Sequence, residues 1–393
     1  MIPLKSVEYI VGTANIVNTP LRVYDDVTCA FIAELSTEIL KSPLSRLYPD
    51  LTALAFWGRK ANLKKQKELF GDTSGRIGRG LCFHIAPSNI PVNFAFTYLF
   101  GLLAGNANIV RLPSKIFPQI DVLCGLIEKI LTNYPEIEKR TCFVRYKRSD
   151  EITAEFCKNV DARMIWGGDK TIENIMSIPT SPRCVDITFA DRYSVAILNG
   201  EAVLASDDNQ IKRLAENFYN DTWLMDQNAC SSPQIILWQN SNNIARNKFW
   251  DAVLEIAKEK YVLQDAVSVD KYTLFCTEAI LNDNAKSFIR NGNLLYREEV
   301  KKLTPDIVKH RGNGGYFFEH NLSGISELFT VITDKYQTIT YFGIDPYKLR
   351  NELIATNIRG IDRIVPVGKA MDIDVIWDGH DLVRELSRVI SVL

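Results

Sequence analysis

The sequence Asp226-Gln227-Asn228-Ala229-Cys230-Ser231-Ser232-Pro233-Gln234 places one thiol among small and polar residues, directly before the apolar run Ile235-Ile236-Leu237-Trp238. We expect that run to be a buried strand. Small neighbours leave room for a bulky electrophile to approach the sulfur, and nearby amides can bind the oxyanion that attack creates. A packing cysteine usually lies inside an apolar run instead. The local pattern leaves two interpretations of Cys230, a nucleophile or a buried bystander.

Length and composition indicate a globular chain with more than one core. The 393 residues are too many for one ordinary core, so we expect two domains. A net charge of −1 gives no reason to expect nucleic acid or an anionic membrane as a partner. The most apolar stretch, residues 94–103, is the length of one buried helix, and the first residues lack the layout of a signal peptide. We therefore expect a cytoplasmic protein without a membrane span.

Cysteine and histidine spacing argues against metal sites and disulfides. Cysteines stand at positions 29, 82, 124, 142, 157, 184, 230 and 276, with no CxxC pair among them. That scatter is typical of reduced thiols in a cytosol and not of a disulfide framework or a zinc knuckle. The four histidines have neither HExxH nor HxH spacing, so we expect no metal.

Strand and helix patterns alternate along the first half of the chain. Residues 81–86 indicate a strand, residues 92–104 an apolar helix, and residues 107–112 a second strand. The alternation continues with helices near 118–133, near 150–159 and from Lys170, and with strands at 141–146 and 162–166. This order predicts a parallel sheet with helices on both faces.

The same pattern restarts after residue 200. A helix at 206–225, the Cys230 turn, a strand at 234–239 and a helix at 245–259 indicate a second α/β domain. From Val375 onward the chain indicates a strand and a short helix.

Ligands of parallel sheets collect at the carboxyl ends of the strands, so residues 87–91, 111–115 and 166–170 should line one crevice. Asn89 is there either an Asx cap of the helix that follows or an oxyanion donor. Arg111-Leu112-Pro113-Ser114-Lys115 is either a solvated loop or a site for ribose or phosphate. Gly167-Gly168 would let a ligand approach the backbone closely.

Three other features favour ordinary structural roles. Gly75-Arg76-Ile77-Gly78-Arg79-Gly80 has the spacing of a dinucleotide fingerprint, but it precedes a strand and opens no helix. We expect a plain Gly-rich turn there. His84 should be a core histidine with its hydrogen bonds satisfied, and Glu327 by itself an ordinary surface glutamate.

Several segments between residues 70 and 385 carry a family resemblance when taken together and in order. They are His84-Ile85-Ala86-Pro87-Ser88-Asn89-Ile90-Pro91, Gly101-Leu102-Leu103-Ala104-Gly105-Asn106, Arg111 to Lys115, Ile165-Trp166-Gly167-Gly168, Asp226 to Gln234, Ser326-Glu327-Leu328-Phe329, and Arg359-Gly360-Ile361-Asp362-Arg363-Ile364-Val365-Pro366-Val367-Gly368-Lys369-Ala370. The chain resembles the aldehyde dehydrogenase superfamily, and most of all its acyl-CoA reductase branch, the fatty-acid reductase component of bacterial bioluminescence systems. The tail and the cysteine element are specific to that branch.

The resemblance implies a fold and roles for named residues. The fold is aldehyde dehydrogenase-like α/β, with two doubly wound domains and a small oligomerisation element. Residues 1–196 would bind the nicotinamide dinucleotide in a Rossmann-like domain, to which part of the C-terminal tail could return. Residues 197–370 would form the catalytic domain, and residues 371–393 a C-terminal strand and helix for oligomerisation. Cys230 would be the nucleophile, with Asn89 and the backbone N–H of Cys230 as the oxyanion hole.

Cofactor roles follow from the same resemblance. Arg111 matches the position that holds the adenosine ribose, Gly167 and Gly168 the turn beneath the pyrophosphate, and Glu327 the acid that binds the nicotinamide ribose. Ser114 replaces a glutamate of NAD-preferring members, and Lys115 is nearby. This indicates NADPH, with NADH as the alternative.

One departure from the superfamily pattern bears on the reaction. Hydrolytic members place a water-activating glutamate about thirty-five residues before the cysteine. Here the corresponding segment is Asp186-Ile187-Thr188-Phe189-Ala190-Asp191-Arg192-Tyr193-Ser194, with Phe189 near the expected position and no glutamate. Asp186 or Asp191 could substitute for it. Otherwise water attack on an acyl-cysteine should be slow.

The resulting hypothesis is an NADPH-dependent reduction of an acyl thioester, fatty acyl-CoA or acyl-protein, to the aldehyde through an acyl-cysteine at Cys230. Two alternatives stay open: an NAD(P)-dependent aldehyde dehydrogenase that makes acids, and a catalytically silent acyl-binding subunit. An acyl-activating enzyme as partner and a homo-oligomer are expected from the resemblance.

Overall fold

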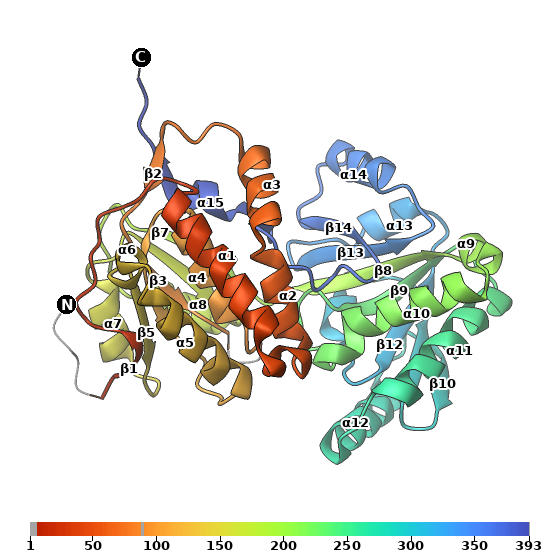
Figure 1. The fold of residues 1–393 in the computed structure, drawn as a ribbon. Helices are drawn as coiled ribbons and strands as arrows, with labels where there is room; N and C mark the ends of the chain where they lie inside the picture. Colours follow the sequence, from red (N-terminus) through yellow and green to blue (C-terminus); the bar gives the residue numbers. More distant parts are fainter. Residues whose placement is uncertain (1–5, 88–89, 393) are drawn as a thin grey trace. The chain divides into compact units, whose positions relative to one another are not determined.

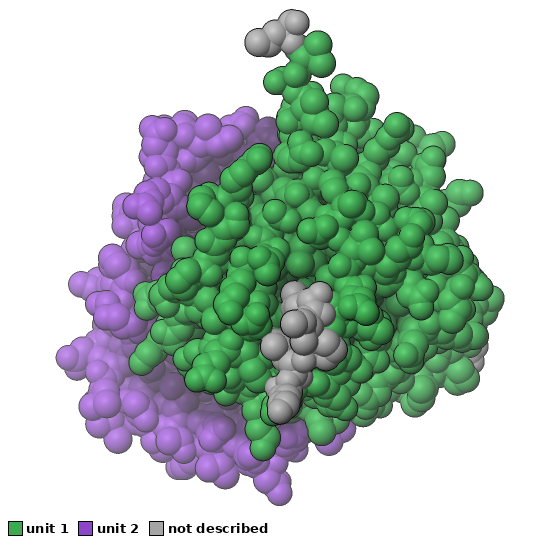
Figure 2. Space-filling model, turned by 90° about the vertical axis from the view of Figure 1, so that its left-hand side faces the viewer, with its two compact units in different colours: residues 1–190, 373–393 green, residues 191–372 purple. Residues whose placement is uncertain are grey.

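The computed structural model describes residues 6–87 and 90–392, apart from the side chain of Arg46. The chain forms two compact units, which Figure 2 colours separately. Unit 1 contains residues 1–190 and 373–393, and unit 2 contains residues 191–372. The division thus falls at 190/191 and 372/373, where the sequence led us to expect 196/197 and 370/371. The C-terminal segment belongs to unit 1.

Unit 1 is built on a six-stranded sheet with the order β1-β5-β4-β3-β6-β7, in which Figure 1 labels β1, β3, β5 and β7. All neighbouring strands are parallel except β1, which runs antiparallel to β5 at one edge. The chain leaves β3 toward β4 and β5, and then returns to the other side of β3 to form β6. That reversal between β3 and β6 is where doubly wound sheets bind ligands. The strands are β1 (Glu8–Gly12), β3 (Leu81–Ile85), β4 (Ala107–Arg111), β5 (Thr141–Arg145), β6 (Ala162–Trp166) and β7 (Val185–Phe189).

Helices cover both faces of this sheet because successive strand residues point to opposite sides. Cys82 packs into the core under α1, α2, α4 and α5, whereas its neighbours Leu81 and Phe83 pack into the core under α7 and α8. The helices are α1 (Asp26–Lys41), α2 (Pro49–Trp57), α3 (Lys60–Phe70), α4 (Asn93–Leu103), α5 (Pro118–Leu131), α6 (Pro135–Glu138), α7 (Asp150–Cys157), α8 (Asp169–Met176) and α15 (Leu382–Glu385), with a 3₁₀ turn at Pro43–Arg46. The predicted parallel sheet with two helical layers is confirmed.

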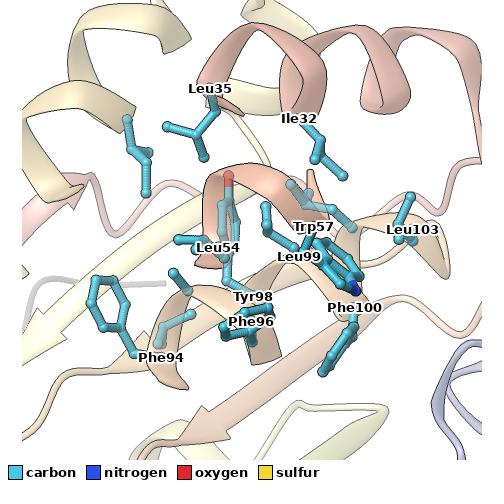
Figure 3. Close-up of a cluster of buried hydrophobic side chains, with 14 of the residues drawn as sticks. Ile32, Leu35, Leu54, Trp57, Phe94, Phe96, Tyr98, Leu99, Phe100 and Leu103 are labelled. Carbon is cyan, nitrogen blue, oxygen red and sulfur yellow. The ribbon is translucent and has the colours of Figure 1, made fainter. Parts of the chain in front are cut away.

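Helix α4 is buried on every side. Its aromatic residues meet the N-terminal helices: the Trp57 ring packs edge-on against Phe96 and Phe100, with centroids 5.6 and 5.5 Å apart (Figure 3). This explains why the most apolar run of the chain needs no membrane: α1 and α2 cover the side of α4 that faces away from the sheet. Among the residues that the structure describes, no helix combines the length and apolarity needed to cross a bilayer.

Unit 2 contains a seven-stranded sheet with the order β10-β11-β12-β9-β8-β13-β14. Its strands are parallel, except that β10 pairs antiparallel with β11 at one edge. The strands are β8 (Tyr193–Asn199), β9 (Pro233–Gln239), β10 (Ala285–Asn291), β11 (Leu295–Val300), β12 (Tyr316–Asn321), β13 (Tyr336–Phe342) and β14 (Arg363–Pro366). Because β8, β9, β12 and β13 are parallel, the segments that lead into them lie at one common edge.

The second sheet is also covered on both faces. Ile236 and Trp238 pack with α10 and α11, while Ile235 and Leu237 pack with side chains of α13 and α14. The helices are α9 (Gly200–Ala205), α10 (Asp208–Thr222), α11 (Asn243–Lys260), α12 (Asp265–Leu281), α13 (Ile325–Phe329) and α14 (Pro346–Ala355), with 3₁₀ turns η2 (Trp223–Met225) and η3 (Pro305–Lys309).

The Gly-rich segment before β3 differs from the expected turn. Residues Arg76–Gly78 form strand β2, which pairs antiparallel with β17 (Ser387–Val389). A Cβ on Gly78 would lie 2.4 Å from the Gly105 carbonyl oxygen, so this glycine is needed for close backbone approach. A second small sheet joins β15 (Ile376–Trp377) and β16 (His380–Asp381). The segment opens no helix, so it lacks the helix N-terminus on which a dinucleotide fingerprint holds the pyrophosphate.

Candidate active site

Cys230 lies in the turn that leads into β9, at the edge of the unit 2 sheet where the parallel strands begin. The Ser232 N–H donates to the Ala229 carbonyl, which closes a tight turn around the half-buried cysteine. The Ser194 hydroxyl donates to the Cys230 carbonyl over 2.6 Å and accepts the Thr338 N–H over 3.2 Å. The peptide that follows the thiol is therefore tied to β8 and β13.

The chain reverses sharply just before this turn. Asp226 and Gln227 both have left-handed backbone conformations, with φ of 50° and 59°. The Tyr261 hydroxyl donates to Asp226 Oδ1 over 2.5 Å, and the Gly314 N–H donates to the Asp226 carbonyl over 3.2 Å. Two consecutive left-handed residues other than glycine are costly, so these contacts hold a backbone that local preference alone would not choose.

The tail motif lies beside the cysteine turn. Asp221, which is buried at the end of α10, accepts the Gly368 N–H at Oδ2 over 2.6 Å and the Ala370 N–H at Oδ1 over 2.9 Å. Burial raises the pKa of Asp221 to about 7. Met371 follows directly, and its sulfur lies 3.7 Å from the Ser231 hydroxyl. Asp221 was not among the residues expected from the sequence to belong to the site, although an aspartate among the buried positions of α10 was a usable signal.

Glu327 lies near the carboxyl ends of the strands of the same sheet, whereas Cys230 lies near their amino ends. Its Oε1 is 2.7 Å from His320 Nε2, and its Oε2 accepts the N–H and the hydroxyl of Ser323. His320 pairs in register with Leu237, which is about 13 Å along β9 from Pro233 at the usual strand rise. Burial acts to raise the pKa of Glu327, but the hydrogen bonds from Ser323 and His320 outweigh it and lower that pKa. The structure does not bring Glu327 to the cysteine turn, and its ribose role stays a prediction.

The predicted cofactor residues of unit 1 lie at the carboxyl ends of β4 and β6, the two strands that flank β3. Arg111 ends β4, and its guanidinium lies over the Tyr146 ring, 4.4 Å from the centroid. Ser114 and Lys115 follow on the exposed loop. Gly167 and Gly168 follow β6, which flanks β3 on the other side. Residues 111–115 and 166–170 therefore lie at the same end of the strands as the end of β3, and the crevice expected there with residues 87–91 stays a prediction.

Gly168 is the N-cap residue of α8, and a Cβ built on it would meet no heavy atom within 4 Å. The space that a side chain at position 168 would occupy is therefore open to a ligand. The position of Gly168, at the amino end of a helix beside the strand reversal, is one that suits a pyrophosphate.

The two remaining residues that the sequence singled out are Asn89 and His84. Asn89 lies outside the described residues, so its expected role as oxyanion donor stays a prediction. His84 is fully buried, with Nδ1 2.8 Å from the Thr97 hydroxyl and Nε2 2.8 Å from Asn108 Oδ1. The expected core histidine with satisfied hydrogen bonds is confirmed.

The position of the missing water-activating glutamate holds a phenylalanine, and the two aspartates that could replace that glutamate are bound by arginines. Phe189 is buried and stacks on Trp166, with ring centroids 3.6 Å apart and an interplanar angle of 11°. Asp186 accepts two hydrogen bonds from the buried Arg163, over 2.6 and 2.5 Å. Asp191 likewise accepts two hydrogen bonds from Arg311, over 2.9 and 3.1 Å. A carboxylate held in this way by a guanidinium is a poor general base.

Within the described ranges 6–87 and 90–392, no group of three or more histidine, cysteine, aspartate or glutamate side chains is placed to hold a metal ion.

The family model described as acyl-CoA reductase (LuxC) matches residues 58–267 of this chain. The long-chain acyl-protein thioester reductase of Vibrio harveyi is 21% identical over 321 residues. That alignment covers 79% of this chain and 63% of the Vibrio harveyi protein, so this chain matches less than two thirds of its relative's length.

Solved structures of aldehyde dehydrogenases share the fold. An NAD-dependent benzaldehyde dehydrogenase from Corynebacterium glutamicum superposes with a TM-score of 0.62 at 12% identity, covering 99% of this chain and 98% of that one. An aldehyde dehydrogenase from Physcomitrella patens gives a TM-score of 0.64 at 11% identity, covering 93% and 85% of the two chains. The predicted aldehyde dehydrogenase-like fold is confirmed.

Proposed function

This chain belongs to the acyl-CoA reductase (LuxC) family, and we propose that it reduces an acyl thioester, fatty acyl-CoA or acyl-protein, to the aldehyde with NADPH. The observation that carries the proposal is the half-buried Cys230 in its tied turn, with a phenylalanine at position 189 and with Asp186 and Asp191 each bound by a guanidinium. A cysteine so placed can pass an acyl group between thiols but cannot readily pass it to water.

The residues at the edge of the unit 1 sheet fit a nicotinamide dinucleotide. Gly168 leaves open space at the amino end of α8 for the pyrophosphate, and Arg111 would bind the adenosine ribose. Ser114 and Lys115 are exposed and carry no negative charge that would repel a 2′-phosphate, which favours NADPH over NADH. When bound, the cofactor supplies the hydride that reduces the acyl group.

Cys230 carries the covalent step. Its thiolate attacks the thioester carbonyl, the C–S bond to the departing thiol breaks, and that thiol takes up a proton. The backbone N–H of Cys230 stabilises the oxyanion together with the Asn89 amide, a donor type that contributes about 3–4 kcal/mol. After hydride addition the carbonyl re-forms, the bond to Cys230 sulfur breaks, and the aldehyde leaves.

Thioester chemistry suits this site because one thioester replaces another at nearly equal free energy. No water-activating base is needed, and neither position 189 nor the two arginine-bound aspartates, Asp186 and Asp191, offers one. The Ser194 hydrogen bond to the Cys230 carbonyl holds the peptide in place throughout.

The test is aldehyde formation by the purified protein from acyl-CoA of graded chain length, with NADPH and NADH in parallel. We expect acyl-CoA-dependent NADPH oxidation and a loss of at least about a thousandfold in Cys230→Ala. Cys276→Ala is the matched control, because Cys276 is also half-buried in unit 2 and lies on α12.

Full activity in Cys230→Ala, or no turnover with any chain length, would overturn the proposal. Acid formation from free aldehyde and NADP without added CoA would instead establish a hydrolytic dehydrogenase.

A further inference from the structure

Two glutamines bracket the cysteine, Gln227 three residues before it and Gln234 four residues after it. Both are almost completely buried. We propose that Gln227 and Gln234 are positioning residues, which fasten the Cys230 turn to the segment 312–316 and so set the direction of the sulfur. The inference rests on the proposed role of Cys230 as nucleophile.

Gln227 binds the backbone of segment 312–316 as a neighbouring strand would. Its Oε1 accepts the N–H of Gly315 over 2.8 Å and the N–H of Tyr316 over 3.2 Å. Its Nε2 donates to the Tyr316 carbonyl over 3.1 Å. Both ends of one amide are thus used on two consecutive residues, which fixes the orientation of the side chain as well as its position.

Gln234 closes the turn from the other side. Its Nε2 donates to the carbonyl of Gln227 over 2.9 Å, and its Oε1 accepts the Gly312 N–H over 2.9 Å. The first hydrogen bond links the two ends of the turn that contains Cys230. The second joins the same turn to segment 312–316, so both glutamines bind the same segment.

Segment 312–316 is itself held in place. Lys271 is buried on α12, and its Nζ donates to the Gly314 carbonyl over 2.6 Å and to the Leu294 carbonyl over 3.3 Å. Gly315 has φ of 97°, and a Cβ there would lie 2.2 Å from the Leu294 carbonyl oxygen. Segment 312–316 then continues into β12, which pairs with β9. A turn fastened to this segment is fastened to the sheet.

The turn needs such fastening because its own backbone is irregular. Between η2 and β9 it has no regular hydrogen-bond ladder, and it starts with two left-handed residues. The amide groups of Gln227 and Gln234 supply the partners that a regular element would provide. A shift of about 1 Å in a nucleophile is enough to slow a reaction a hundredfold.

Replacing either amide by a carboxylate keeps the size but removes the donor of one hydrogen bond. In Gln227→Glu an oxygen faces the Tyr316 carbonyl, and in Gln234→Glu an oxygen faces the Gln227 carbonyl. With the new carboxyl ionised, two buried acceptors face each other without a proton between them. Gln210→Glu is the matched control, because Gln210 accepts the Asp207 N–H in an exposed capping box, where glutamate serves equally well.

The experiment measures acyl-CoA reduction and amide hydrogen exchange on the full chain of all three variants. We expect kcat to fall about tenfold or more in Gln227→Glu and Gln234→Glu, with KM within about threefold of wild type. Exchange should accelerate in peptides covering 225–234 and 312–316 and stay unchanged in the unit 1 sheet. Gln210→Glu should match wild type in both measurements.

Unchanged exchange in both peptides, or a fall in kcat matched by an equal change in Gln210→Glu, would overturn the proposal that Gln227 and Gln234 position the Cys230 turn. Should the wild-type protein reduce no acyl-CoA at all, the proposed function fails, and the exchange result alone still decides whether the glutamines hold the turn.

Discussion

The buried imidazole of His84 predicts a stability loss on acidification that can be worked out from the structure. Burial lowers the pKa of His84 from its ordinary 6.5 to about 4, while the hydrogen bond to Asn108 acts weakly the other way. Asn108 Nδ2 donates to the Asn106 carbonyl, so Asn108 Oδ1 accepts from His84 and the neutral ring carries its proton on Nε2. The folded chain therefore holds a neutral ring in unit 1.

The direction in which stability changes with pH follows from whether the folded or the unfolded chain binds the proton. Above the unfolded pKa both states are neutral, and the contribution of His84 is fully present. Between pH 6.5 and about 4 the unfolded chain binds a proton that the folded chain does not, so stability falls as pH falls. From about pH 7.5 to about pH 5 the two pKa values give a loss of about 2 kcal/mol from this residue.

The assay compares wild type with His84→Gln by urea unfolding at both pH values. Hydrogen exchange of the peptide that covers β3 follows unit 1 separately, because two units need not unfold together. The variant should be less stable at neutral pH but should lose about 2 kcal/mol less on acidification. Equal losses in the two proteins would refute the argument that this ring stays neutral in the fold.

Two further predictions concern buried charge and cofactor choice. Glu319 accepts the indole N–H groups of Trp238 and Trp250 and the Nε–H of Arg297, so Glu319→Gln leaves a buried guanidinium without its charge partner and should cost about 3–5 kcal/mol in denaturant unfolding. Glu298→Gln is the contrast, since burial raises the pKa of Glu298 to about 7 and an amide mimics its protonated form; a loss below about 1 kcal/mol is expected near pH 6, and equal losses in the two variants would contradict this account. Lys115→Glu reverses one exposed charge and should raise KM for NADPH about tenfold at low salt while moving KM for NADH less than about threefold. Steady-state kinetics with both cofactors measures it, and an equal effect on the two would remove Lys115 from the phosphate site.

Several features of the molecule were predictable from local pattern. The strand at 162–166 and the helices near 118–133 and 245–259 appear within a few residues of the expected bounds, because hydrophobic period and turn residues act over short range. The common edge for residues 111–115 and 166–170 followed from one rule about parallel sheets.

Other features depend on partners distant in sequence. Strand β2 was expected to be a turn, since its partner β17 lies about three hundred residues away and no local signal reveals the pairing. The same holds for Asp186 and Asp191: the sequence presents two carboxylates near a missing glutamate, and only Arg163 and Arg311 show that both are bound.

The sequence by itself determined that a single cysteine stands among small residues before a buried strand, and which chemistry that arrangement permits. Only the tertiary structure decided how that cysteine is held. Gln227 and Gln234 are polar residues at a strand boundary in the sequence, and their meaning comes from segment 312–316, which folds against them about eighty residues later. Side-chain identity is a local property and can be read in order along the chain. Hydrogen-bond satisfaction of a buried amide depends on whichever backbone the fold brings beside it.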